Sequence, residues 1–111
     1  MKLYGIKTCD SVKKAIKFLK ENQIDFDFID FKTMPISCEK IEEWLQQVDI
    51  DTLFNKRGKK YKELKLKDLN LDDTAKKEWL CKENILIKRP VIEYKNKIIV
   101  GFNIDKYKEF L

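Results

Sequence analysis

The fold class is most readily predicted from residues 1–31, MKLYGIKTCDSVKKAIKFLKENQIDFDFIDF. Residues 1–5 are typical of a short strand. Four apolar residues then follow the i, i+3, i+4, i+7 spacing of an amphipathic helix: Val12, Ala15, Ile16 and Leu19. The segment DFDFIDF, residues 25–31, predicts a second strand that is covered on both faces. A strand, a crossover helix and a strand predict a right-handed βαβ unit with parallel strands.

Downstream of this unit the pattern indicates several helices. Ser37 is suited to cap a second helix. Residues 50–71 are irregular and predict short helical pieces, and a further helix spans about residues 72–83.

The last quarter of the chain returns to β-structure. RPVIEY (89–94) and KIIVGF (97–102) are two β-rich segments that predict a hairpin around residues 95–97. NIDKYKEFL (103–111) predicts a closing helix with Asn103 as its cap.

This order of elements predicts an α/β fold of the thioredoxin/glutaredoxin type. We expect a mixed four-stranded sheet with helices on both faces. An all-helical insertion, at about residues 37–85, would separate the βαβ half from the ββα half of one domain spanning residues 1–111. Fold alone does not define function.

The composition agrees with one folded domain in a reducing compartment. The chain has 111 residues, of which 43% are hydrophobic, which suffices for one core but not for two. We expect neither a signal peptide nor a membrane span. The three cysteines, at positions 9, 38 and 81, predict neither a paired disulfide framework nor a metal site. We therefore expect a cytoplasmic protein with no tightly bound cofactor.

The positive charge is concentrated in KRGKKYKELKLK, residues 56–67. This segment carries a net charge of +6, whereas the whole chain carries +5. A solvated lysine-rich face is one interpretation, and a surface for anions or nucleic acid is the other. Since Tyr61 is the only aromatic residue in the run, we do not expect nucleic acid as a partner.

Cys9 stands where the first predicted strand gives way to the helix, in a chain with no histidine to serve as a catalytic base. A helix N-terminus offers partial positive charge and free N–H groups, and both favour a thiolate. Lys7 adds a nearby cation, and Thr8, Asp10 and Ser11 are able to cap or hydrogen-bond the turn. The alternative is a buried core cysteine, against which these polar neighbours argue.

Val12 occupies the position that the second cysteine would take in a Cys-x-x-Cys motif. Cys9 therefore cannot close a local disulfide after it has attacked a substrate. Its release requires an external thiol such as glutathione, or Cys38 or Cys81 if either lies close. For Cys38 and Cys81 themselves we expect structural roles, with Cys81 in the core.

Arginine is scarce in this lysine-rich chain, with Arg57 and Arg89 as the two examples. A guanidinium binds an anion through two parallel hydrogen bonds, which lysine cannot do. Arg57 precedes Gly58, which permits a sharp turn. Arg89 precedes Pro90, and an X-Pro bond there is able to be cis. The alternative for both is a surface arginine without a special role.

Four motifs occur in order along the chain: LYGIKTCDSVKKA, NKRG, IKRPVI and VGF. Together they resemble the ArsC-like (arsenate reductase-related) family of the thioredoxin superfamily, and especially its short glutathione-dependent thiol reductase-like branch. The resemblance covers essentially the whole chain. It implies that Cys9 is the nucleophile and that the Arg89–Pro90 bond is cis. It also leads us to expect a substrate- or anion-binding set: Lys7, Ser11, Arg57, Arg89 and Pro90.

In the arsenate reductases of this family, the thiolate attacks arsenate, and glutathione with glutaredoxin completes the reduction. Those enzymes have a histidine in the loop before the cysteine, where this chain has Gly5-Ile6-Lys7. They also have a further arginine after the Arg-Pro motif, whereas residues 91–111 of this chain contain none. A glutathione-linked thiol or disulfide reductase needs neither residue. The anion would then be arsenate or a glutathione carboxylate, with glutathione as co-substrate and glutaredoxin as a candidate partner.

A second interpretation comes from another class of protein. Spx-type transcription regulators of the same superfamily bind RNA polymerase and sense oxidation through Cys-x-x-Cys. Val12 removes that switch but leaves open a polymerase-binding or other non-catalytic interaction role.

Overall fold

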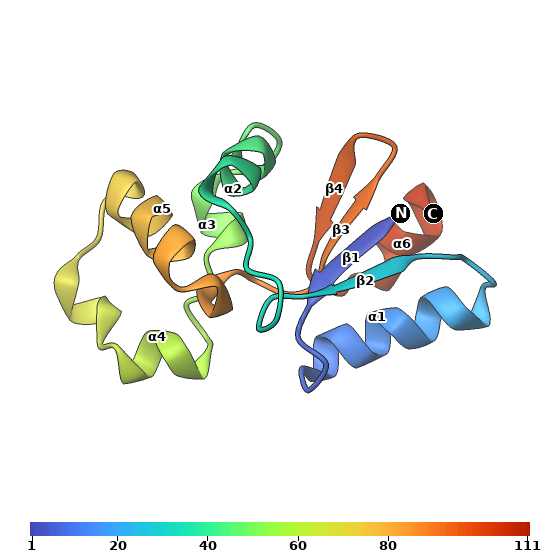
Figure 1. Cartoon of the computed structure of the whole chain (residues 1–111), viewed down its shortest axis with the longest axis horizontal. Coiled ribbons are helices and arrows are strands. Elements are labelled where there is room, and N and C mark those ends of the chain that lie inside the picture. Colours follow the sequence, from blue (N-terminus) through green and yellow to red (C-terminus); the bar gives the residue numbers. More distant parts are fainter. The chain divides into compact units, whose positions relative to one another are not determined.

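The computed structural model describes residues 1–111 and divides them into two compact units (Figure 1). The sheet unit comprises residues 1–34 and 89–111, and the helical unit comprises residues 35–88. None of the helices combines the length and the apolar character that crossing a bilayer requires.

The sheet unit has the predicted βαβ and ββα halves. Its elements are β1 (Lys2–Gly5), α1 (Asp10–Glu21), β2 (Asp27–Asp30), β3 (Val91–Tyr94), β4 (Lys97–Val100) and α6 (Ile104–Phe110). The strands form one mixed sheet in the order β2-β1-β3-β4. β1 pairs with β2 in parallel, whereas β1 with β3 and β3 with β4 are antiparallel. The predicted α/β fold of the thioredoxin type is confirmed.

One buried cluster joins the sheet to both helices of this unit. Three neighbouring strands contribute Leu3, Ile92 and Ile99, which lie side by side in register. Helix α1 contributes three of its four predicted apolar residues, Val12, Ala15 and Leu19. The rings of Phe18 on α1 and Tyr107 on α6 meet edge-on with centroids 5.5 Å apart. Both helices therefore cover the same face of the sheet, and the prediction of helices on both faces is wrong within this unit.

The second strand is shorter and less buried than its sequence predicts. β2 spans Asp27–Asp30, and its residues are half-buried or exposed. It lies at the edge of the sheet and pairs only with β1. The alternation of aromatic and acidic residues indicated a strand, but the prediction that both of its faces are covered is wrong.

The hairpin and its neighbouring cap follow the sequence closely. Tyr94 pairs with Lys97, which leaves Lys95 and Asn96 as a two-residue turn with φ values of 49° and 64°. Positive φ at both positions is the conformation that matches the twist of an antiparallel hairpin. Asn103 caps α6 as predicted, because its Oδ1 accepts a hydrogen bond from the Lys106 N–H at 3.1 Å.

The helical unit is built from short helices. They are α2 (Cys38–Leu45), α3 (Ile50–Leu53), α4 (Lys59–Glu63), η1 (Leu66–Leu69), α5 (Asp73–Lys82) and η2 (Asn84–Leu86). Ser37 caps α2 as predicted, with its Oγ 3.1 Å from the Lys40 N–H. The buried interior of this unit includes Ile41, Trp44, Leu53, Leu80 and Leu86.

A disulfide joins two of these helices, so the prediction that the three cysteines form no paired disulfide is wrong. Cys38 begins α2 and is bonded to Cys81 near the end of α5, 43 residues further along the chain. Cys38 is exposed and Cys81 is half-buried, so the prediction of Cys81 as a core residue is wrong. The packing of α2 against α5 brings the two sulfurs together.

Candidate functional site

Cys9 occupies the N-cap of α1, directly after the loop that leaves β1. Its backbone is fixed on both sides. The Cys9 N–H donates to the Ile6 carbonyl at 3.1 Å, and the Cys9 carbonyl accepts from the Lys13 N–H at 3.0 Å. The first hydrogen bond closes the loop, and the second begins the helix.

The N-cap is the position whose side chain normally accepts a hydrogen bond from the first turn of the helix. Here the residue is cysteine, and its side chain makes no capping hydrogen bond. Thr8, Asp10 and Ser11, which the sequence suggested as residues that cap or hydrogen-bond this turn, do not occupy the N-cap position. The thiol therefore stands where the side chain of a serine or aspartate would meet the free N–H groups of the first turn.

Cys9 is half-buried and is the one cysteine outside the disulfide. It packs against the cluster shared by the sheet, α1 and α6. Of the two residues expected to assist it near the start of α1, Lys7 is exposed and Ser11, in the first turn, is half-buried. Cys9 thus has a fixed backbone and is not sealed in the core.

Gly5 contributes to this loop in a way that the sequence did not reveal. A Cβ atom on Gly5 would lie 2.6 Å from Cγ2 of Val12, closer than side chains approach one another. The end of β1 therefore contacts the first turn of α1 because this residue has no side chain. Gly5 thus permits this contact from within Gly5-Ile6-Lys7, the loop segment that precedes Cys9 and has no histidine.

Arg89 and Pro90 lie at the same end of the sheet. Tyr4 pairs with Val91, so the antiparallel register carries Pro90 toward Gly5, where the Cys9 loop begins. The Arg89–Pro90 peptide is cis, as expected. The Pro90 carbonyl accepts a hydrogen bond from the Gly101 N–H at 2.7 Å, and Arg89 is half-buried. Strand pairing thus brings Arg89 and Pro90 to the end of the sheet from which the chain runs to Cys9 and helix α1.

Arg57 belongs to the helical unit, where it is exposed. Its N–H donates to Oδ1 of Asn55 at 3.1 Å, and the Asn55 N–H donates to the Leu86 carbonyl at 2.8 Å. Gly58 has an ordinary φ of −76°, so the turn at residues 56–57 does not depend on a left-handed glycine conformation. Its lack of a side chain matters instead for space, since a Cβ would lie 2.9 Å from Nδ2 of Asn55.

The basic run at residues 56–67 is largely solvated. Most of its lysines are exposed, and Lys60 is half-buried. Lys56 forms an ion pair with Asp51 at 3.5 Å. Tyr61, its single aromatic residue, packs edge-on against Phe54 with ring centroids 5.9 Å apart. That ring serves the interior of the helical unit, which agrees with a solvated lysine-rich face.

Comparisons with known proteins agree with this geometry. The sequence model of the ArsC family matches residues 4–110. A solved structure of an arsenate reductase related protein from Brucella melitensis is 32% identical, covers 98% of this chain and 92% of its own, and has a TM-score of 0.78. A solved Staphylococcus aureus protein is 37% identical, with coverage of 98% and 96% and a TM-score of 0.81.

A third relative has a different described role. The global transcriptional regulator Spx of Lactiplantibacillus plantarum is 30% identical over an alignment of 113 positions, which covers 98% of this chain and 84% of that protein. Similarity therefore extends to both arsenate reductase-related proteins and a regulator. On the match over residues 4–110, the chain belongs to the ArsC family.

Proposed function

We propose that the protein is a glutathione-linked thiol–disulfide oxidoreductase whose nucleophile is the Cys9 thiolate. The observation that supports this most directly is the position of Cys9. It is a half-buried free thiol at the N-cap of a twelve-residue helix, at the end of the sheet to which Arg89 and Pro90 also belong. Helix N–H groups there would stabilise the thiolate before and after exchange.

The reaction fits a single cysteine. The Cys9 thiolate attacks the glutathionyl sulfur of a mixed disulfide, and the other sulfur leaves as a thiolate that takes a proton from water. A glutathione thiolate then attacks the sulfur bonded to Cys9. This step yields glutathione disulfide and restores the Cys9 thiolate. Val12, in place of a second cysteine, leaves no local competitor for the intermediate.

The anion-binding residues are part of the proposal. Arg89 would bind a glutathione carboxylate or arsenate, with Lys7 and Ser11 contributing near the start of α1. Arg57 is assigned to anion binding on the family resemblance. Glutaredoxin would be a protein partner for the arsenate reaction, and the cytoplasm would supply the reduced glutathione that either reaction consumes.

A comparison of cysteine variants tests the role of Cys9. Reduction of a glutathionylated peptide by glutathione is measured for the unchanged protein, Cys9→Ser, and the double variant Cys38→Ser/Cys81→Ser. We expect turnover to be lost in Cys9→Ser and retained in the double variant. Equal turnover in Cys9→Ser would remove Cys9 from the reaction.

Arginine-to-lysine variants test the anion site. Arg57→Lys and Arg89→Lys keep the charge but lose the paired hydrogen bonds, so each should weaken the protection of Cys9 from alkylation by glutathione or arsenate. Lys62→Arg is a matched exposed control in the basic run. Unchanged protection in an arginine variant would exclude that arginine from the site.

A regulatory role is the second candidate, and similarity to an Spx regulator favours it. Such a protein would bind RNA polymerase through its surface, without need of the Cys9 thiol. Titration with purified RNA polymerase separates the two proposals. Tight binding that survives Cys9→Ser, combined with no glutathione-dependent turnover, would support the regulator.

A further inference from the structure

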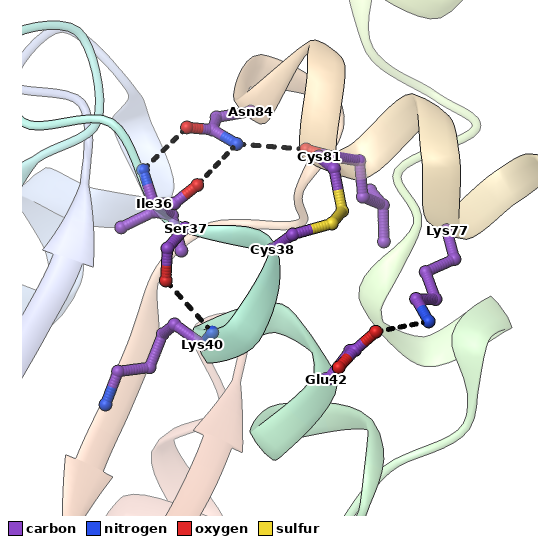
Figure 2. The surroundings of a disulfide bond; sticks show 9 residues. Ile36, Ser37, Cys38, Lys40, Glu42, Lys77, Cys81 and Asn84 are labelled. Carbon is purple, nitrogen blue, oxygen red and sulfur yellow. Dashed lines mark hydrogen bonds and ion pairs between the residues drawn. A yellow bond between two sulfur atoms is a disulfide. The ribbon is translucent and has the colours of Figure 1, made fainter.

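We propose that Cys38 and Cys81 form a second thiol–disulfide exchange centre, which reacts with low-molecular-weight thiols through the Cys38 sulfur. This centre lies entirely within the helical unit and does not rest on the chemistry proposed for Cys9. Three features of the molecule point to it: the exposure of the two cysteines, their positions on their helices, and the contacts that flank them (Figure 2).

The two cysteines differ in access to solvent. Cys38 is exposed, whereas Cys81 is half-buried on α5. A thiol from solvent therefore approaches the Cys38 side of the bond more easily. Attack there would displace Cys81 and leave the incoming thiol bonded to Cys38. In a reducing compartment, disulfides of this accessible kind are usually exchanged rather than permanent.

The two cysteines also differ in their electrostatic setting. Cys38 is the first residue of the eight-residue helix α2, next to the N–H groups of its first turn. Cys81 is the penultimate residue of α5, where the helix dipole has its negative end. Negative charge is therefore more stable on Cys38, although the neighbouring Glu39 carboxylate offsets part of this effect. When the pair is reduced, Cys38 is the stronger candidate for the reactive thiolate.

Non-covalent contacts hold the two helices together on either side of the disulfide. The Asn84 Oδ1 accepts from the Ile36 N–H at 2.7 Å, and its Nδ2 donates to the Leu80 carbonyl at 2.9 Å. This side chain thus ties the entry of α2 to the last turn of α5, as Figure 2 shows. One helical turn away from the sulfurs, Lys77 on α5 forms an ion pair with Glu42 on α2.

These contacts do not involve sulfur, so they remain when the disulfide is reduced. The two thiols then stay opposite each other at a high effective concentration, which favours re-formation of the bond. The arrangement is that of a reversible pair, because one of the two cysteines is exposed and the contacts that flank the bond do not include sulfur.

The exchange is balanced with glutathione as the thiol. A glutathione thiolate attacks the Cys38 sulfur, the Cys38–Cys81 bond breaks, and Cys81 leaves as a thiolate and is protonated. A second glutathione thiolate attacks the glutathionyl sulfur, which releases glutathione disulfide and reduced Cys38. Two glutathione thiols supply the two electrons, and the two cysteines gain them.

The test uses the full chain with Cys9→Ser, so failure of the Cys9 proposal does not affect it. The protein is equilibrated in mixtures of glutathione and glutathione disulfide, alkylated, and weighed by mass spectrometry. We expect the native protein to convert between disulfide and dithiol across mixtures that span the cytosolic range, with its circular dichroism retained. A bond that is reduced only after unfolding would overturn the proposal.

Single-cysteine variants test the asymmetry. With Cys9→Ser present in both, Cys81→Ser leaves Cys38 alone and Cys38→Ser leaves Cys81 alone. We expect Cys38 to react with glutathione disulfide about tenfold faster than Cys81 at neutral pH. Equal rates, or faster reaction of Cys81, would contradict the assignment of Cys38.

Asparagine variants test the contacts that hold the pair together. Asn84→Ala should shift the equilibrium toward the dithiol in a given glutathione mixture, because the thiols are held together less firmly. Asn22→Ala is the matched control, since it removes a 2.8 Å bond to the Phe18 carbonyl in the sheet unit. An unchanged equilibrium in Asn84→Ala would show that this contact does not maintain the pair.

Discussion

The two units present a cysteine at the start of a helix in different ways. In the sheet unit, Cys9 is the N-cap of α1, and its loop is closed by backbone hydrogen bonds to residues a few positions away. In the helical unit, Cys38 is the first residue of α2 and is bonded to Cys81, which is distant in sequence. Both cysteines lie at a helix N-terminus, so the difference between the two sites comes from the neighbouring structure. Cys9 packs against the buried cluster of the sheet unit, whereas Cys38 faces Cys81 on α5.

The difference extends to how each unit is held together. Strand pairing and one buried cluster organise the sheet unit. The short helices of the other unit enclose a buried interior of their own, and the Cys38–Cys81 disulfide and side-chain contacts such as Asn84 to Ile36 join them. Short helices have little stability of their own, so tertiary contacts of this kind maintain them.

The largest expected effect is a loss of stability confined to one unit, which tests whether the two units unfold separately. Trp44 is 1% exposed in the helical unit, and Trp44→Ala should destabilise that unit by about 3–5 kcal/mol through loss of buried apolar contacts. Hydrogen exchange should show lost protection in residues 35–88 and retained protection in β1 and β3. Equal loss in the strands would mean that the two units unfold as one.

A pair of glycine substitutions compares the two loops. Gly5→Ala forces a Cβ against Val12, whose branched side chain adapts poorly, and should cost about 1–3 kcal/mol while slowing the alkylation of Cys9. Gly58→Ala meets the end of the Asn55 side chain and should cost less, with no effect on Cys9. Thermal unfolding and alkylation rates measure both. A larger effect at Gly58 would reverse this comparison.

The smallest expected effects concern how the free energy of unfolding of each unit depends on pH. The Lys76 side chain, followed by Lys56, holds the pKa of Asp51 in the helical unit below its ordinary value of 3.8. The resulting stabilisation is complete above that value and is lost as the pH falls through the lower folded pKa. Asp51→Asn should therefore flatten the acid part of the stability profile. An acid profile that does not change would show that this exposed pair contributes nothing measurable.

In the sheet unit, the pH dependence of stability is expected at alkaline pH. Burial raises the pKa of Tyr107, whose hydroxyl donates to the Gly101 carbonyl at 2.8 Å, above its ordinary value of 10.0. The unfolded chain ionises first, so stability falls as the pH rises above 10.0. Tyr107→Phe should remove this part of the alkaline loss in a series of denaturant titrations. An identical alkaline slope in the variant would contradict the assignment.

The local patterns of the sequence were sufficient for most of the fold. The apolar spacing from Val12 to Leu19 predicted α1, and Ser37 and Asn103 were recognised as caps. These features depend on residues within one or two turns of each other, which a sequence displays directly. Cys9 was recognised as a candidate nucleophile for the same reason, because the end of a strand and the start of a helix are local features.

Errors arose where a neighbour distant in sequence decides the outcome. Whether a strand such as β2 is central or at an edge depends on the order of strands in the sheet. The two glycines are a different case, because their partners are near in sequence. Gly5 leaves space for Val12 and Gly58 leaves space for Asn55, and this depends on how those side chains are placed. No local signal distinguishes these glycines from those that adopt a special φ.

Periodicity and short-range hydrogen bonding were enough to predict the main helices, the strands, the caps at Ser37 and Asn103, and the place of Cys9 at the start of α1. Two further features follow from tertiary packing: α1 and α6 share one face of the sheet, and Cys38 meets Cys81. Both outcomes require segments far apart in the chain to pack together, and the free energy of that packing comes from buried side chains whose partners the linear order does not specify.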